Sequence, residues 1–330
     1  MSEASIEIVA PAGTPAALRA AVDAGADAVY AGFRDETNAR NFPGLNFSRE
    51  EMAEAIGYIH ARGRKLFLAV NTFAEAGRPE PWRRAVDDAA RFGADSVILA
   101  DIGLLDYAAS RHPQLRRHLS VQAAASNPEA IRLYAAAFGV RRVVLPRVLT
   151  LEAIAKLVRS AEVEFEVFAF GGMCVMAEGR CALSSYVTGL SPNMHGVCSP
   201  PSHVRYEARG DTLVSLLGGL TIDRFAPGEP AGYPTLCKGR FCVRGEESHL
   251  FEDPVSLSAL DLLSALGGAG VRALKIEGRQ RGPVYVGRVV AAFRQAIDAV
   301  ARGEAPPTVA LGDLTEGARV TAGAYRKGWR

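Results

Sequence analysis

Three of the chain's five cysteines lie within one short segment that is rich in glycine, proline and serine. Cys174, Cys181 and Cys198 fall in GGMCVMAEGRCALSSYVTGLSPNMHGVC, and Cys237 and Cys242 follow it. A single free cysteine is commonly a small buried hydrophobic residue, but a loop of this composition is a poor place to pack one. The clustering therefore predicts metal binding or catalysis.

The spacing of these cysteines bears on the kind of metal. Gaps of six, sixteen and thirty-eight residues separate the first four, Cys174, Cys181, Cys198 and Cys237. Structural zinc sites more often use close Cys-x-x-Cys pairs, so the wide gaps favour an iron–sulfur cluster held by four thiolates. His195 and His203 lie in the same segment and leave a mixed zinc site as the alternative.

The elements that must position these residues follow a regular order. Eight short apolar runs have the composition of buried strands, at 6–10, 27–31, 65–70, 96–100, 119–123, 142–146, 165–170 and 272–276. Helical patterns lie between most of them and begin at capping residues such as Thr14, Ser48, Asn127 and Thr150. This repetition predicts an α/β fold of the (β/α)8 TIM-barrel type, with an open doubly wound sheet as the alternative.

The spacing of the strands breaks once, between the seventh and the eighth. Residues 171–270 separate them and hold all five cysteines. In a barrel this insertion leaves the carboxyl end of a strand, which is the face where barrel active sites lie. We therefore expect a barrel domain over 1–303 that includes the insertion, and a polar C-terminal tail over 304–330.

Composition weakens the case for several other classes of protein. The 330-residue chain has a formal net charge of +2, which is too small to predict an extended nucleic-acid footprint. No apolar run approaches the ~20 residues that span a bilayer, and no secretory signal begins the chain, so we expect a cytoplasmic protein. GxSxG, HExxH and GxxxxGK[ST] motifs are missing, which disfavours a peptidase or a nucleotide-dependent enzyme.

Four long segments carry a resemblance to a known family. They are VAPAGTPAALRAAVDAGADAVYAG, SVQAAASNPEAIRLYAAAFGVRRVVLPRVLTLEAI, CVMAEGRCALSSYVTGLSPNMHGVC and LKIEGRQRGPVYVGRVVAAFRQAID. Over nearly its whole length the sequence resembles the peptidase U32 family. The pattern EGRCxLSSYxTGxSPNxxGVCSP is similar to the branch that serves ubiquinone biosynthesis without oxygen, which is not proteolytic.

The resemblance implies a cofactor, a partner and a reaction. The cofactor is a [4Fe–4S] cluster ligated by Cys174, Cys181, Cys198 and Cys237, although Cys242 could replace Cys237 as the fourth ligand. The partner is a UbiV-like second U32 protein, with which the chain would form a heterodimer. Together such proteins hydroxylate the aromatic ring of a prenylated ubiquinone precursor, with prephenate as the hydroxyl donor and other soluble pathway proteins as further candidate partners.

Two other functions stay open at this point. Other members of the family hydroxylate RNA bases, and these commonly carry an extra C-terminal domain. The family name itself refers to peptidases, so a U32-type peptidase or a zinc-stabilised scaffold is a further alternative. For the first function, a lipid-like substrate predicts an exposed apolar patch near the carboxyl face of the barrel.

Seven polar side chains follow the ends of predicted strands and are candidates to position substrates: Asn71, Asp101, Gln122, Arg147, Lys275, Glu277 and Arg279. Arginine suits a dicarboxylate donor because its planar fork binds both oxygens. We therefore expect Arg147 and Arg279 to bind the donor and Glu277 to act as an acid or base. Alternatively, Lys275, Glu277 and Arg279 form an ion-paired rim, and we expect Glu178 and Arg180 to pair and brace the cysteine loop.

Overall fold

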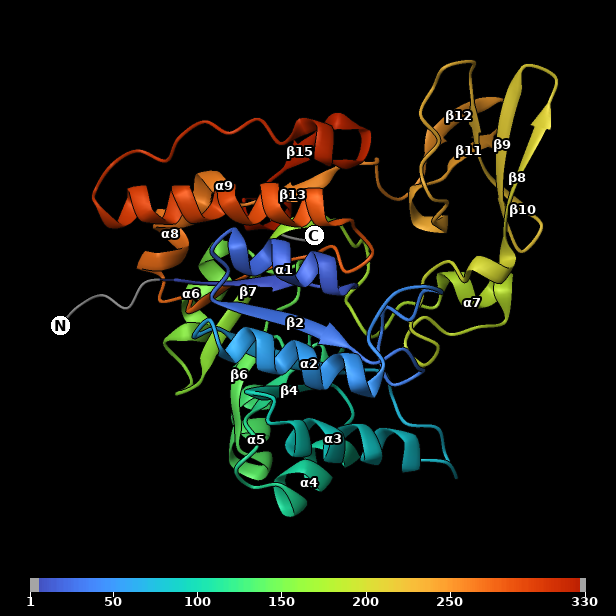
Figure 1. The fold of residues 1–330 in the computed structure, drawn as a ribbon. Coiled ribbons are helices and arrows are strands. Elements are labelled where there is room, and N and C mark those ends of the chain that lie inside the picture. Colours follow the sequence, from blue (N-terminus) through green and yellow to red (C-terminus); the bar gives the residue numbers. More distant parts are fainter. Residues whose placement is uncertain (1–5, 327–330) are drawn as a thin grey trace.

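Eight parallel strands close into a barrel in the computed structural model, which describes residues 6–326 (Figure 1). The barrel strands are β1 (Glu7–Pro11), β2 (Ala28–Gly32), β3 (Lys65–Val70), β4 (Ser96–Leu99), β5 (Arg117–Leu119), β6 (Val140–Val144), β7 (Glu164–Gly172) and β14 (Ala273–Ile276). Each pairs in parallel with its neighbours, and β14 pairs with both β7 and β1. This closure confirms the predicted (β/α)8 TIM-barrel-like fold and rules out the open sheet.

Helices surround the barrel on its outer face (Figure 1). They are α1 (Pro15–Asp23), α2 (Arg49–His60), α3 (Glu80–Phe92), α4 (Ile102–Arg111), α5 (Pro128–Phe138), α6 (Leu151–Val158), α8 (Leu263–Gly268) and α9 (Pro283–Ala301). Over residues 6–326, no helix is both long and apolar enough to cross a membrane.

The predicted capping residues begin their helices. The side chains of Thr14, Asn127 and Thr150 each accept a backbone N–H of the first turn. Ser48 forms a reciprocal capping box with Glu51. Such caps satisfy the N–H groups that the first turn leaves free, and they fix where each barrel helix starts.

One predicted strand is wrong in its position. The strand expected at 119–123 lies at Arg117–Leu119, and Val121–Ala123 forms a 3-10 turn instead. The Ser120 hydroxyl accepts the Gln122 N–H, and Ala124 has a left-handed φ of 50°. Ser120 thus begins the 3-10 turn directly after β5 and Ala124 ends it, which places Gln122 in the cavity lining.

The insertion after β7 builds a small subdomain that stands beside the barrel (Figure 1). It contains α7 (Leu183–Thr188), a three-stranded antiparallel sheet and an antiparallel hairpin. The sheet consists of β8 (Val204–Arg209), β9 (Thr212–Leu217) and β10 (Leu220–Phe225), and the hairpin of β11 (Arg240–Val243) and β12 (Glu246–His249). The chain then returns through β13 (Ser256–Ser258), which pairs antiparallel with β7.

Part of the predicted tail packs against this returning strand. β15 (Val320–Thr321) pairs with β13, and Lys238 forms an ion pair with Glu316. The Tyr325 hydroxyl donates to the Phe168 carbonyl of β7 (2.5 Å). The described part of the tail therefore ties the insertion to the barrel, while residues 327–330 lie outside the described residues.

Two apolar layers stabilise the barrel. The larger lies between the strands and the surrounding helices and includes Trp82, Phe165 and Phe293. The smaller fills the barrel interior with Val9, Ala28, Tyr30, Phe67, Ile98 and Ala273. Alternate residues of each strand face these two layers, as the two-residue period of a strand requires.

An ionic layer closes the amino end of the barrel interior. The Arg142 guanidinium lies 2.5 Å from Glu7, 2.6 Å from Glu164 and 3.3 Å from Glu166. Although burial alone would raise them, Arg142 lowers the pKa values of Glu7 and Glu164. Burial, together with Arg142 and Arg116, lowers the pKa of His118 well below its ordinary value.

These shifts predict that acid destabilises the barrel. The unfolded chain takes up a proton at His118 near pH ~6.5 and at the glutamates near pH ~4.3, whereas the folded chain resists both. Because the unfolded state binds more protons, the free energy of unfolding falls as pH drops through these values. Urea unfolding at pH 7.5, 5.5 and 4 measures this fall. His118→Gln should flatten the step between pH 7.5 and 5.5, and an unchanged step would contradict the assignment.

Candidate functional site

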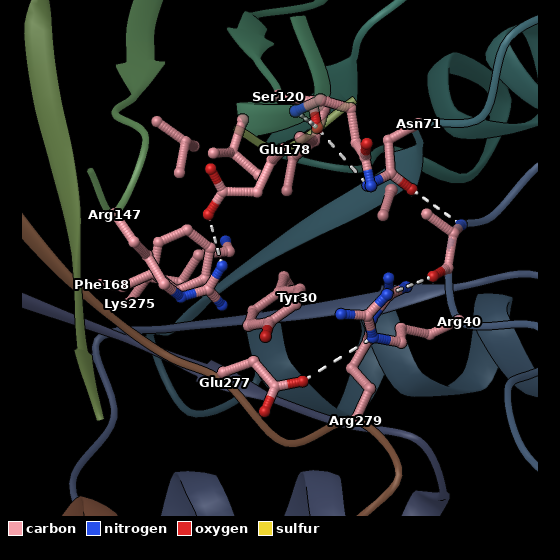
Figure 2. Close-up of a pocket in the computed structure, with 16 residues that line it drawn as sticks. Tyr30, Arg40, Asn71, Ser120, Arg147, Phe168, Glu178, Lys275, Glu277 and Arg279 are labelled. Atoms are coloured by element: carbon pink, nitrogen blue, oxygen red, sulfur yellow. Dashed lines mark hydrogen bonds and ion pairs between the residues drawn. The ribbon is translucent and has the colours of Figure 1, made fainter. Parts of the chain in front are cut away.

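A cavity of about 70 Å³ lies at the carboxyl ends of the barrel strands (Figure 2). At roughly 10–15 Å³ for each water, this volume admits several water molecules. Six of the seven predicted positioning residues line it: Asn71, Gln122, Arg147, Lys275, Glu277 and Arg279. The seventh, Asp101, caps α4 instead and accepts the Gly103 and Leu104 N–H groups.

The cavity lining is cationic. Four basic side chains, Arg40, Arg147, Lys275 and Arg279, face two carboxylates, Glu178 and Glu277. Lys275 is paired inside the barrel with Glu166 (2.7 Å). The excess of positive charge in a confined space favours an anionic ligand.

Arg279 is the cation with the least compensation. It is 4% exposed, and its side-chain hydrogen bond runs from Nη1 to Asn38 Oδ1 (2.5 Å). Within residues 6–326 it joins no ion pair. Burial lowers the pKa of Arg279 to about 10, so the guanidinium stays charged at neutral pH and can bind a carboxylate through two parallel hydrogen bonds.

A glycine lets the β1–α1 loop approach this arginine. A Cβ added at Gly13 would lie 1.8 Å from the Arg279 carbonyl oxygen. The backbone around Arg279 therefore has no room for any other residue at position 13. This close packing fixes the position of the Arg279 backbone, from which the side chain extends.

Glu277 is buried and ionised. Its Oε1 lies 3.7 Å from Arg40 Nε, and its Oε2 accepts the Gly172 N–H at 3.4 Å. Burial opposes ionisation, but Arg40 and Arg147 outweigh it and lower the pKa of Glu277. At neutral pH the group can therefore accept a proton but has none to donate. Lys275, Glu277 and Arg279 have separate partners, so the ion-paired rim does not form among them.

Arg147, which was predicted to bind the donor, is paired with a carboxylate of the chain itself. Its Nη1 lies 2.6 Å from Glu178 Oε1 with both side chains buried, and its guanidinium stacks on Phe168 at 3.5 Å. The predicted pair between Glu178 and Arg180 is wrong, because Glu178 turns inward and Arg180 is exposed. Arg147 thus holds the cysteine loop against the barrel. The Glu178 carboxylate already balances its charge.

Removal of Arg147 should destabilise the fold strongly. Arg147→Met leaves Glu178 as a buried, unpaired carboxylate, which costs about 3–5 kcal/mol. Urea unfolding measures the loss. Arg180→Met, on the same loop but exposed, is the matched control and should change the free energy of unfolding by less than about 0.5 kcal/mol. Equal losses in the two variants would contradict a structural role for the pair.

The sequence reasoning missed Tyr30, Asn38 and Arg40. Tyr30 of β2 faces the barrel interior. Lys275 Nζ lies 3.7 Å from the centroid of its ring. Asn38 and Arg40 lie in the irregular loop after β2. The rule that sites form at the carboxyl ends of barrel strands points to this loop, but no motif within it marks these residues.

The cysteines predicted to bind a cluster lie near one another. The Cys198 thiol interacts electrostatically with Cys174, Cys181 and Cys237, and Cys174 also interacts with Cys237. Burial raises the pKa values of Cys174 and Cys181, and that of Cys237 to about 12. Cys242 is exposed on β11 opposite Glu247.

The donor set is that of a thiolate-bound cluster, but the side chains are not drawn together as ligands. Within the described residues, no three His, Cys, Asp or Glu side chains converge to hold a metal ion. Against the effect of burial, the backbone N–H groups of Met176 and Leu183 favour the thiolate forms of Cys174 and Cys181. The donor chemistry fits the implied cluster.

The two histidines of the insertion have local partners. His195 contacts Ser191 through Nδ1, and His203 contacts Ser202. Neither belongs to a convergent group of metal ligands within residues 6–326. These contacts give no support to the mixed zinc site.

The cysteines border the cationic cavity. Interactions with Glu277, Cys198 and Cys174 outweigh burial and raise the pKa of Arg40. Arg147 likewise interacts with Cys174. Both arginines line the cavity, so the thiols lie within electrostatic range of it, although no cysteine is among its lining residues within 6–326.

Several large apolar side chains of the insertion are exposed. Tyr186 on α7 is 88% exposed, and Met194, Tyr233, Leu250 and Phe251 are also exposed. The insertion leaves the carboxyl end of β7, so these side chains lie on the side of the molecule where an apolar patch was expected. Their use by a lipid-like substrate stays a prediction.

Comparison with known proteins places the chain in a family. The pattern of Peptidase family U32 matches residues 13–329. The tRNA hydroxylation protein P of Escherichia coli is 31% identical over 94% of this chain and 72% of its own length. The 23S rRNA 5-hydroxycytidine C2501 synthase of the same species is 30% identical over 91% of this chain and 40% of its own. A collagenase of Porphyromonas gingivalis is 29% identical over 92% and 68%. The match over residues 13–329 shows that the chain belongs to peptidase family U32.

Proposed function

We propose that this chain is the iron–sulfur subunit of a hydroxylase that works without O₂ on the aromatic ring of a ubiquinone precursor, in a UbiU-like role. The observation that carries the proposal is that the cysteine group interacts electrostatically with two arginines of the cationic cavity. Arg40 and Arg147 line the cavity and interact with Cys174. Redox chemistry and small-molecule binding therefore meet at one place.

The proposed cofactor is a [4Fe–4S] cluster held by Cys174, Cys181, Cys198 and Cys237. When bound, it supplies single-electron chemistry that no ordinary side chain provides. The chain's own residues hold the Cys174–Cys181 loop in place through the buried pair of Arg147 and Glu178.

The proposed hydroxyl donor is a small carboxylic acid such as prephenate, bound at Arg279. This guanidinium is buried and charged, joins no ion pair among the described residues, and presents its fork to the cavity. Arg147 is not assigned to the donor, because Glu178 already neutralises it. Glu277 is assigned as a base, because Arg40 keeps it ionised.

The charge of the insertion favours a small ring substrate over RNA. Residues 199–253 carry six basic residues (Arg205, Arg209, Arg224, Lys238, Arg240, Arg244) and eight acidic ones (Glu207, Asp211, Asp223, Glu229, Glu246, Glu247, Glu252, Asp253). This subdomain stands beside the barrel mouth, where a long nucleic acid would pass. Phosphates bind to an excess of lysine and arginine, which this surface lacks. The proposed partner is a UbiV-like U32 protein in a heterodimer.

The second candidate function is hydroxylation of an RNA base. It is favoured by the printed roles of two relatives, a tRNA hydroxylation protein and an rRNA 5-hydroxycytidine synthase. A peptidase role has the name of the collagenase relative in its favour, but among residues 6–326 no nucleophile with a base partner lines the cavity.

A deletion strain of the source organism, grown without oxygen, tests the choice. Mass spectrometry of the quinone pool and of hydroxylated nucleosides gives two independent readouts. The proposal expects loss of ubiquinone with RNA hydroxylation intact, restored by the wild-type gene and not by Cys174→Ala. Loss of a hydroxylated nucleoside with ubiquinone intact would establish the second function instead.

A further inference from the structure

Two buried acceptor oxygens face the cavity without hydrogen-bond partners. Glu178 Oε2 and Gln122 Oε1 are both inaccessible and unpaired within residues 6–326. Both residues line the cavity. Buried acceptors are rarely left unsatisfied, and an exception calls for an explanation such as a ligand.

The two acceptors are held by segments that pack tightly on each other. A Cβ added at Gly179 would lie 1.8 Å from the Gln122 carbonyl oxygen, and Gly179 has a left-handed φ of 78°. Glu178 is fixed further by its ion pair with Arg147 (2.6 Å). The acceptors are thus set before any ligand arrives.

The side of the cavity away from Glu178 carries a basic side chain, Arg279. Figure 2 shows Glu178 and Arg279 on opposite sides of Tyr30. Apolar side chains of β3, β4 and β6 line the space as well: Ala69, Ile98 and Val144. The cavity therefore has a cationic end at Arg279, an apolar middle, and a polar end where Glu178 and Gln122 offer acceptors and Arg147 offers a donor.

We propose that Glu178 and Gln122 form a subsite that accepts a hydrogen bond from a hydroxyl group on the ligand, at the end remote from its carboxylate. This inference rests on the carboxylate site proposed at Arg279. Arg147 Nε, a buried donor on the partner of Glu178, is also unpaired within residues 6–326, and a hydroxyl group suits this end because it can donate to Glu178 and accept from Arg147. The ligand class is a small acid with an apolar body and a distal hydroxyl group.

Two probes that differ in one hydroxyl group test the subsite. They are 4-hydroxyphenylacetate and phenylacetate, titrated calorimetrically into the full chain and its variants. Wild type should bind the hydroxylated probe at least about tenfold more tightly, since hydrogen bonds to charged groups are among the stronger ones. Gln122→Leu, which keeps the Arg147 pair, should lower this ratio, and Glu178→Gln should bring it close to one.

The controls separate the two ends of the ligand. Arg279→Met should weaken both probes equally and leave any difference between them unchanged. Equal binding of the two probes to wild type would overturn the subsite while leaving the carboxylate site standing. A tenfold ratio retained in both Gln122→Leu and Glu178→Gln would overturn it as well. Binding of neither probe to wild type overturns the subsite and the carboxylate site, whereas the iron content tests the cluster independently.

Discussion

Replacing Arg279 by methionine should abolish hydroxylation without weakening the fold. The variant loses the one buried cavity cation that joins no ion pair within residues 6–326. If the donor carboxylate pairs with it, the loss removes one member of a buried charge pair, roughly 2–5 kcal/mol. Turnover of the donor should then fall by at least about 100-fold.

The same substitution should leave the melting temperature unchanged or raise it. A buried charge without a carboxylate partner costs desolvation energy, and a methionine of similar length removes that cost. Binding sites often retain such unfavourable groups because function needs them. Thermal unfolding and donor turnover, measured on one preparation, test the two halves of the prediction.

Two variants control for the position of the charge. Arg281→Met changes a neighbouring arginine that stacks on Tyr285 at 5.3 Å and lies outside the cavity lining, and it should keep full turnover. Arg279→Lys keeps the charge but loses the planar fork, so an intermediate loss is expected. Full turnover in Arg279→Met would remove Arg279 from the site.

The barrel was predictable because its signals are local. Each strand is a short apolar run, and each capped helix starts at a polar residue such as Thr14 or Ser48 whose side chain satisfies the first turn. The positions that differ have local causes too. At Ser120, the side chain accepts the Gln122 N–H and begins a 3-10 turn where the strand was expected to continue.

The small sheets of the insertion were missed although one signal was present. The run TLVSLLGGLTIDRF holds two strands around Gly218 and Gly219. Both glycines have positive φ, 57° and 91°, as a two-residue hairpin turn of type I′ requires. Hairpins of this kind are readable from sequence when both flanking runs are considered together.

The candidate site was predictable only in part. The strand-end rule located Glu277 and Arg279, because the carboxyl ends of barrel strands converge. The hydrogen-bond and ion-pair partners of the site residues could not be predicted. Arg147 and Glu178 are 31 residues apart, and Arg279 and Asn38 are 241 apart. No periodicity relates such residues, since only the closed barrel brings their segments together.

The cysteines should divide into four that are essential for iron and one that is not. After anaerobic purification, wild type should hold about four irons and four sulfides per chain, with the visible absorption of a cluster. Alanine at Cys174, Cys181, Cys198 or Cys237 should remove most of the iron. Cys242→Ala is the matched control and should keep it.

The decisive comparison is between Cys237 and Cys242, because four residues separate two otherwise similar thiols. Cys237 is partly buried and interacts with Cys174 and Cys198, whereas Cys242 is exposed on β11 opposite Glu247. The 3-10 turn at Leu236–Lys238 places Cys237 near the other thiols, whereas the hairpin keeps Cys242 in solvent. If Cys242→Ala lost the iron and Cys237→Ala kept it, Cys242 and not Cys237 would be the fourth ligand. Stoichiometric zinc without visible absorption would leave the barrel intact and remove redox chemistry from the proposal.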